Sequence, residues 1–327
     1  WWSGAGPTPW QASVSSVAVD NVYASSWSLT GADLPAPSNL TNGTSYYITS
    51  AGLDNADDGG NFEGYYSVRG STFIYDVSKP STTITGPVHL STVSSLAALT
   101  GTTLDEPGYS NASRVSAQTD KVQVTIQRYS DAQYFTGGGW GALTWLATST
   151  TAVNAVSGTW QKNTGLPTWV HNESYWIVAR SSDAAGNVQS EFTVGVDSRS
   201  VTFDLQGATA SIGNFVLAGG TSYYNQYTLS GSSITGTVVD SPAGVSSVEI
   251  AISSNASSDG TSSWYNGVGF TAALGGANVY RSTSAGYVSN APGVGDSWNL
   301  VDATMFGLME QGKSYKIKVR TTDFAVP

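Results

Sequence analysis

The sequence lacks cysteine altogether and has only two histidines and two methionines among its 327 residues. With His89 and His171 as its only imidazoles and no thiols, one chain cannot assemble a structural zinc site, an iron–sulfur cluster or a cysteine nucleophile. Neither histidine stands in a triad-like context with a serine or carboxylate, and an enzyme is not expected.

Positive charge is scarce as well. The chain has 13 Lys and Arg against 23 Asp and Glu, which gives a formal net charge of −10. A protein that binds duplex nucleic acid normally presents a basic face, so nucleic acid is not an expected partner. No apolar run approaches the roughly 18 residues of a membrane span. The first residues also lack the basic start and apolar stretch of a signal peptide.

In several stretches, every second residue is apolar. Val122, Val124 and Ile126 alternate with polar residues, and the same alternation runs from Val248 to Ile252. This pattern puts one face of a strand into a core and the other toward water. Hydrophobic residues make up 40% of the chain and aromatic residues 11%, enough for packed cores. The sequence therefore predicts an all-β protein with short strands.

One block of sequence occurs three times, with its first tyrosine at Tyr46, Tyr175 and Tyr315. In each copy an aspartate follows eight residues later. Other landmarks keep the phase, which indicates a tandem array of one module of about 130 residues. The landmarks are Asp54, Asp183 and Asp323; Trp27, Trp160 and Trp298; Asp76 and Asp204; and Asp105 and Asp240. We predict the C-terminal part of a module in residues 1–76, a complete module in residues 77–204, and a module without its last strand in residues 205–327.

The strand that begins each block has two distinct faces. In the second copy Tyr175, Ile177 and Ala179 share one side, and Tyr315, Ile317 and Val319 share the equivalent side in the third copy. The opposite side varies between copies, as expected for a strand with one face buried in a sandwich.

The motifs of the repeat resemble those of bacterial immunoglobulin-like modules. Arg180, Asp183, Ala185, Gly186 and Asn187 match the R-x-x-D-x-A-G-N turn of that family, and the stretch from Ile234 to Ile250 is similar to its front half. The resemblance implies tandem immunoglobulin-like β-sandwiches in a linear array, as in large surface adhesins and extracellular filament proteins. It also implies an extracellular or cell-surface location without catalytic chemistry. The first copy departs from the motif by three extra turn residues, and the third stops before any Gly-Asn.

Two incomplete modules thus flank a complete one. One interpretation is that the sequence is a segment of a longer chain. The other is that subunits complete one another by strand exchange, because an open sheet edge can pair with a strand from another subunit. Both interpretations predict a fibre. Continuous main-chain density between Pro327 and a following module would eliminate strand exchange.

The aspartate-rich turns are the candidate metal sites. The first turn offers Asp54, Asp57, Asp58 and Asn61, and the second offers Asp183 and Asn187, while Asp76 and Asp204 could complete a site. Calcium prefers such hard oxygen ligands, and we expect it as the candidate ion. The alternative is ordinary turn chemistry, because Asp and Asn side chains bond nearby main-chain groups.

Aromatic residues permit two interpretations. Trp140, Trp145, Trp264 and Tyr265 lie near glycine-rich stretches and could stack on sugar rings. Alternatively, large aromatics fill the space between two sheets, and the regular phase of Trp27, Trp160 and Trp298 favours that core role. Residues 137–139, three consecutive glycines, are expected at a hairpin tip.

We therefore predict a structural or adhesive extracellular protein whose partners are copies of itself or neighbouring modules, head to tail, and surface glycans. A polysaccharide-binding module is the alternative, and an accessory segment of a secreted glycan-active enzyme is the third.

Overall fold

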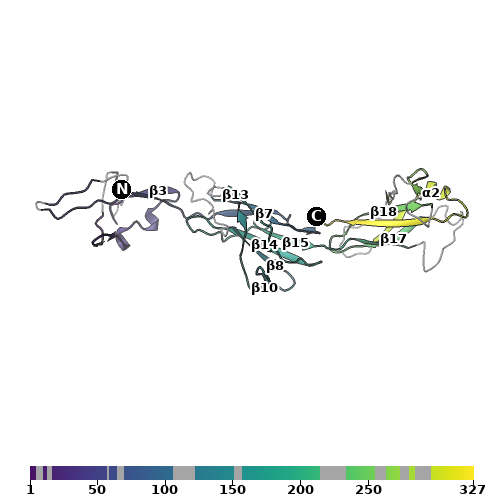
Figure 1. Cartoon of the computed structure of the whole chain (residues 1–327), viewed down its shortest axis with the longest axis horizontal. Helices are drawn as coiled ribbons and strands as arrows, with labels where there is room; N and C mark the ends of the chain where they lie inside the picture. The colour runs from purple at the N-terminus through teal and green to yellow at the C-terminus, as the bar shows by residue number, and fades with distance from the viewer. Residues whose placement is uncertain are drawn as a thin grey trace.

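The computed structural model describes residues 1–4, 10–12, 17–56, 59–64, 70–105, 122–150, 157–213, 233–254, 263–272, 280–283 and 296–327. Its regular structure is almost entirely β-strand. Three parts follow one another along the long axis of the molecule: an N-terminal segment, a central sandwich and a C-terminal sandwich (Figure 1). No helix among the described residues is long and apolar enough to cross a membrane.

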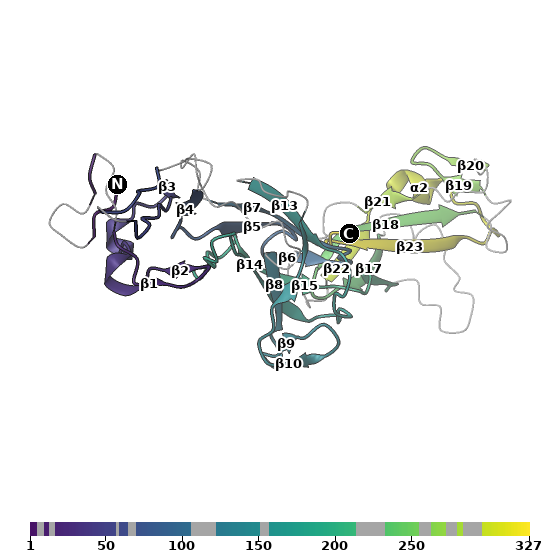
Figure 2. The ribbon, with the colours of Figure 1, turned by 60° about the vertical axis from the view of Figure 1, so that its left-hand side comes forward.

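The central sandwich consists of two sheets. Its strands are β5 (Ser81–Gly86), β6 (Ser91–Val93), β7 (Leu99–Leu104), β8 (Val122–Arg128), β9 (Tyr134–Phe135), β10 (Trp140–Gly141), β11 (Leu146–Ala147), β12 (Ser149–Thr150), β13 (Ser157–Lys162), β14 (Ser174–Ser181) and β15 (Ser198–Phe203). One sheet has the order β10-β9-β8-β14-β15-β6, with β11 also paired to β8, and the other has the order β12-β13-β7-β5. The two sheets lie face to face in Figure 2.

The alternating sequence pattern explains this core. Ile126 pairs with Ile177 across β8 and β14, and both side chains are completely buried. The inward face predicted for β14 is confirmed, because Tyr175, Ile177 and Ala179 are buried while Trp176 and Arg180 on the other face are half-buried.

The C-terminal sandwich repeats this arrangement. Its elements are β16 (Thr209–Ile212), β17 (Ile234–Val239), β18 (Val245–Ser253), β19 (Ser263–Tyr265), β20 (Phe270–Ala272), β21 (Arg281–Ser282), β22 (Asp296–Leu300), the short helix α2 (Ala303–Gly307) and β23 (Lys316–Asp323). One sheet has the order β16-β17-β22; in the other, β18 pairs with β19, β21 and β23. The hydrophobic core of the C-terminal sandwich shares no residue with the core of the central sandwich.

The repeated tyrosine forms the same hydrogen bond in all three parts of the chain. The hydroxyl oxygens of Tyr46, Tyr175 and Tyr315 each accept a hydrogen bond from the main-chain N–H five residues upstream, at 2.7, 3.2 and 2.8 Å. A tyrosine that bonds back to its own chain at the start of a strand is typical of immunoglobulin-like sandwiches. The fold is therefore a tandem array of immunoglobulin-like β-sandwich modules, with the central one complete.

A tryptophan packed on a glycine recurs in the two sandwiches. Trp160 on β13 pairs with Gly101 on β7, and Trp298 on β22 pairs with Gly236 on β17. In each case a Cβ on the glycine would lie about 2.4–2.5 Å from the indole ring, closer than any side chain allows. The same Cβ would also lie about 2 Å from a main-chain carbonyl oxygen, of Thr83 or of Ser211, so only glycine fits at these positions.

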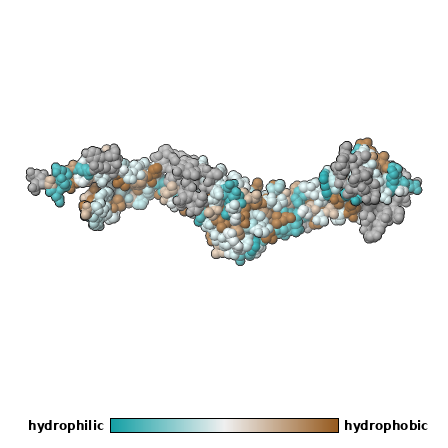
Figure 3. All heavy atoms as spheres, in the orientation of Figure 1, coloured by the Kyte–Doolittle hydropathy of each residue, from teal (hydrophilic) through white to brown (hydrophobic). Residues whose placement is uncertain are grey.

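The N-terminal segment is more open. It contains β1 (Asn21–Val22) paired with β2 (Trp27–Ser28), the single-turn helices η1 (Gly31–Asp33) and η2 (Pro37–Asn39), and β3 (Thr44–Ile48) paired with β4 (Ser71–Tyr75). Trp27 is 48% exposed, whereas Trp160 and Trp298 are 2% and 1% exposed. The expected core position is thus confirmed for Trp160 and Trp298 and wrong for Trp27, which has no opposing sheet among the described residues. Apolar patches on this segment are visible in Figure 3.

The two sandwiches are joined by the covalent chain and by main-chain hydrogen bonds. The chain passes from the end of β15 at Phe203 to the start of β16 at Thr209. In addition, Val326 forms a parallel bridge with Val93 of β6, with main-chain hydrogen bonds to Thr92 and Ser94 of 3.0 and 2.8 Å. The C-terminus accordingly lies at the junction of the two sandwiches (Figure 1). The module boundaries after residues 76 and 204 stay predictions.

Candidate metal centres at the module junctions

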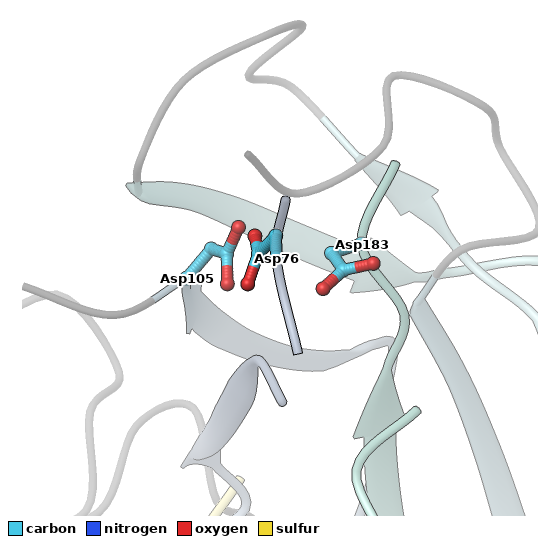
Figure 4. A group of neighbouring side chains, drawn as sticks. All are labelled: Asp76, Asp105 and Asp183. Atoms are coloured by element: carbon cyan, nitrogen blue, oxygen red, sulfur yellow. The ribbon is translucent and has the colours of Figure 1, made fainter. Parts of the chain in front are cut away.

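Three aspartates meet where the N-terminal segment joins the central sandwich. Asp76 follows β4, Asp105 follows β7 and Asp183 follows β14, and one carboxylate oxygen of each lies within 4.8 Å of the others. Their carboxylates face one another in Figure 4. Asp105 and Asp183 are almost completely buried. We call this set the first cluster.

Main-chain and amide groups hold the first cluster in place. Asp183 Oδ1 accepts hydrogen bonds from the N–H groups of Gly186 and Asn187 at 2.7 and 2.8 Å. Asp76 Oδ1 accepts one from Ser78 at 2.9 Å. The Asn187 amide nitrogen donates to Asp183 Oδ2 at 2.8 Å and to the Asp76 carbonyl oxygen at 3.2 Å. Asn187 therefore acts as a donor that links the two segments, and its amide nitrogen faces the carboxylate.

This geometry suits a hard cation. Oxygens that bind one calcium ion at 2.3–2.6 Å lie no more than about 5 Å apart, as the three carboxylate oxygens do. Carboxylates this close repel one another unless a proton or a cation offsets their charge. The structure brings the predicted residue Asp183 to Asp76 and adds Asp105. Calcium binding there stays a prediction.

The first predicted turn is an exposed loop. Asp54 Oδ1 accepts hydrogen bonds from the N–H groups of Asn61 and Ala56 at 2.6 and 3.1 Å, and Oδ2 accepts the Asn61 amide at 2.9 Å. The bonds from Asn61 lower the pKa of Asp54. Asp57 and Asp58, which we also predicted as ligands, lie outside the described residues. The bonds of Asp54 are those expected from turn chemistry.

A second cluster occupies the equivalent positions at the next junction. Asp204 follows β15, Asp240 follows β17 and Asp323 ends β23. Burial, together with the nearby carboxylates of Asp204 and Asp323, raises the pKa of Asp240 to about 6. His171 Nδ1 lies 3.2 Å from Asp204 Oδ1 and accepts a hydrogen bond from the Leu205 N–H at 3.2 Å.

Sequence reasoning did not include Asp105 and Asp240 among the candidate ligands. Both were recognised as matched landmarks of the repeat, and that match was the available signal. Their approach to Asp183 and Asp323 depends on how β7 and β17 cross the sandwich, which a single sequence does not reveal.

Most tryptophans of the described sandwiches serve packing. Trp264 and Tyr265 are buried, and Trp140 contacts Tyr175 with ring centroids 5.8 Å apart. Trp145 stacks on Phe192 and under the Arg180 guanidinium. The exposed tryptophans are those of the N-terminal segment, Trp1, Trp10 and Trp27.

Both histidines bind main-chain groups. His89 Nδ1 accepts a hydrogen bond from the Ser200 N–H at 3.0 Å, and its ring packs edge-on against Trp176. Together with the Leu205 N–H bond to His171, these contacts fix turns at the ends of strands.

No protein-family model and no curated protein matches the chain. Among solved structures, the chain is similar to the FN1–FN3 domains of chicken CNTN1, with 12% sequence identity and a TM-score of 0.27. That match covers 93% of this chain and 83% of the other. The strand pairing, the two separate cores and the repeated tyrosine bond are the features of the chain that define its fold.

Proposed function

We propose that the chain is a structural, adhesive component of an extracellular filament, fibre or long stalk, similar to those built from bacterial immunoglobulin-like modules. The observation that supports this most strongly is the serial arrangement of two sandwiches with separate cores along a rod (Figure 1). Such arrays span distance, because each module contacts only its neighbours.

Copies of the chain or neighbouring modules would continue the rod head to tail. In the central sandwich β14 is paired on both sides, with β8 and β15. Among the described residues its equivalent β23 pairs only with β18. A strand added beside β23 would reproduce the pairing of β14 on both sides in the central sandwich, and a head-to-tail contact of this kind does not close on itself. The proposal includes no catalytic step.

Negative-stain imaging of the full chain over a range of concentrations tests the filament role. We expect fibres with a regular subunit repeat, and light scattering should report a mass that grows with concentration. A monodisperse particle at every concentration would overturn self-assembly. Continuous main-chain density from Pro327 into another module would replace strand exchange by a longer chain and leave the stalk role intact.

Polysaccharide binding is the second candidate, because Trp1, Trp10 and Trp27 are exposed in the N-terminal segment. Exposed aromatic rings can stack on sugars. Co-sedimentation with insoluble polysaccharide should then fall in the Trp27→Ala variant and be unchanged in Tyr129→Ala, which removes an exposed ring of the central sandwich. Absence of co-sedimentation, or an equal loss in both variants, would reject this role.

A further inference from the structure

The strand pair that closes a module occurs twice with the same register. β3 pairs with β4 so that Tyr46 lies opposite Phe73. β14 pairs with β15 so that Tyr175 lies opposite Val201. Tyr315 is the third copy of that tyrosine and lies directly before β23. A strand equivalent to β4 or β15 would therefore find the matching register beside β23.

The turn before the repeated tyrosine is also shared. Gly43, Asn172 and Gly312 each stand three residues before it and have positive φ angles of 72°, 60° and 78°. The Gly43 N–H donates to the Tyr75 carbonyl oxygen at 2.8 Å. The Asn172 N–H donates to the Phe203 carbonyl oxygen at 2.7 Å, so in both copies the turn holds the last residue of the closing strand. Within the described ranges the Gly312 N–H has no such main-chain acceptor, and the third turn can hold the same strand end.

Apolar side chains on β4 and β23 are less well buried than their counterparts in the central sandwich. Val201 on β15 is completely buried, whereas its equivalent Phe73 on β4 is 39% exposed. Ile177 on β14 is completely buried, whereas its equivalent Ile317 on β23 is only half-buried. Bringing β4 beside β23 would cover both side chains with apolar surface, and such burial is the dominant favourable contribution to most protein association.

An exchange of strand partners costs little in main-chain hydrogen bonds. β4 would leave a five-residue pairing with β3 and enter a pairing of the same register with β23. Exchange of an identical element between subunits is for this reason a low-cost route to association. β3 and β4 form a two-stranded sheet by themselves among the described residues, so their separation disrupts no larger sheet.

We propose that β4 of one copy of the chain adds beside β23 of a second copy and thereby replaces β3. Phe73 then lies opposite Tyr315 of the second copy, whose Gly312 N–H donates to the Tyr75 carbonyl oxygen. This contact rests on the proposed filament role and names the strand that continues the rod. β4 leads into the central sandwich as β15 leads into the C-terminal one, so each added copy extends the rod and offers its own β23 to the next.

The absence of cysteine allows the contact to be tested by disulfide formation. In the central sandwich Ser174 and Thr202 lie opposite each other with their hydroxyl oxygens 2.7 Å apart, close enough for a disulfide between cysteines at these positions. The equivalent positions in β23 and β4 are Ser314 and Ile74, and both are exposed. Cysteines there should leave both sandwich cores intact.

Full-length Ser314→Cys and Ile74→Cys variants are mixed under mild oxidation, and linked peptides are identified by mass spectrometry. We expect a disulfide between the two copies. The control replaces Ser314→Cys by Thr322→Cys, at an exposed position near the other end of β23. The yield should be at least about tenfold lower in the control, because only opposed positions meet the Cβ separation that a disulfide requires.

A second variant locks the strand before it can exchange. Ser45 lies opposite Ile74 in the β3–β4 pair, so a chain with Ser45→Cys and Ile74→Cys can tie β4 to its own β3. When oxidised it should lose the growth of mass with concentration in light scattering, and reduction should restore that growth. Ser174→Cys with Thr202→Cys ties β14 to β15 in the same way and should assemble like the wild type.

Two results would overturn the proposal: equal disulfide yields with Ser314→Cys and Thr322→Cys, or assembly of the oxidised locked variant like that of the wild type. Fibres without the expected disulfide would refute exchange of β4 and leave the filament role intact. A monodisperse wild type without the disulfide would reject both.

Discussion

Substitution of Asp240 by asparagine should change how the stability of the chain depends on pH in calcium-free buffer. The folded protein raises the pKa of this carboxyl from 3.8 to about 6, because burial and the carboxylates of Asp204 and Asp323 disfavour its ionised form. The folded state therefore binds more protons than the unfolded state between pH 3.8 and pH 6. Stability contributed by this group is present at low pH and is lost as the pH rises through about 6.

The size of the effect follows from the shift of about two pKa units. Each unit corresponds to 1.36 kcal/mol, so the wild type should lose about 3 kcal/mol of unfolding free energy between pH 4 and pH 7 through this group. Asp240 as a whole residue is 6% exposed, and about 3 kcal/mol is the upper limit of the effect because solvent close to the carboxylates screens their repulsion. Asp240→Asn cannot ionise and should flatten this part of the profile, with a gain of up to about 3 kcal/mol at pH 7.

Urea unfolding followed by tryptophan fluorescence at several pH values measures this profile. Chelator-treated protein is required, since a bound cation would offset the same repulsion. Glu310→Gln serves as the control and should keep the wild-type slope. A wild-type stability that rises from pH 4 to pH 7, or an unchanged slope in Asp240→Asn, would refute the reasoning about this group.

Four further substitutions, one of them a control, test the packing and the first junction. Gly101→Ala places a Cβ against the Trp160 ring and should cost about 1–3 kcal/mol or more in urea unfolding. Gly138→Ala, with open space around it, should change stability by less than about 0.5 kcal/mol, and equal costs would contradict the packing argument. Tyr175→Phe removes the hydroxyl acceptor of a main-chain N–H and should cost about 1 kcal/mol; a neutral result would mean that water replaces the bond. Asn187→Ala removes both amide bonds across the first cluster, and hydrogen exchange should rise at that junction but stay unchanged around β18.

The sequence predicted the repeated strands well because their signal is local. The two-residue period places Ile126 and Ile177 in a core whatever the rest of the chain does, and both are buried. The hairpin tip at residues 137–139 lies between β9 and β10, as the glycines indicated.

Whether a side chain is buried against a second sheet could not be predicted from the local pattern alone. Trp27 has the phase of Trp160 and Trp298, yet it is exposed because β1 and β2 form an isolated pair. Phase in a repeat specifies the strand on which a side chain lies, but burial also requires a partner surface.

The candidate site was predictable only in part. Turn chemistry identified Asp54 and Asp183, and the side chain of each accepts hydrogen bonds from the following Asn. The contribution of Asp105 comes from a strand far away in sequence, so its place beside Asp183 depends on the crossing of the two sheets. Residue type alone also gave Asn187 the role of an oxygen ligand, whereas its amide nitrogen faces Asp183.

The bridge between Val326 and Val93 gives the junction of the two sandwiches mechanical properties that a single linker would lack. A rod segment held by one strand of polypeptide can swivel about that strand. Here the second attachment lies to one side of the covalent connection at residues 204–208, so rotation about the long axis must break main-chain hydrogen bonds. Twisting one sandwich against the other should therefore cost the free energy of these hydrogen bonds, a resistance that a single covalent strand does not provide.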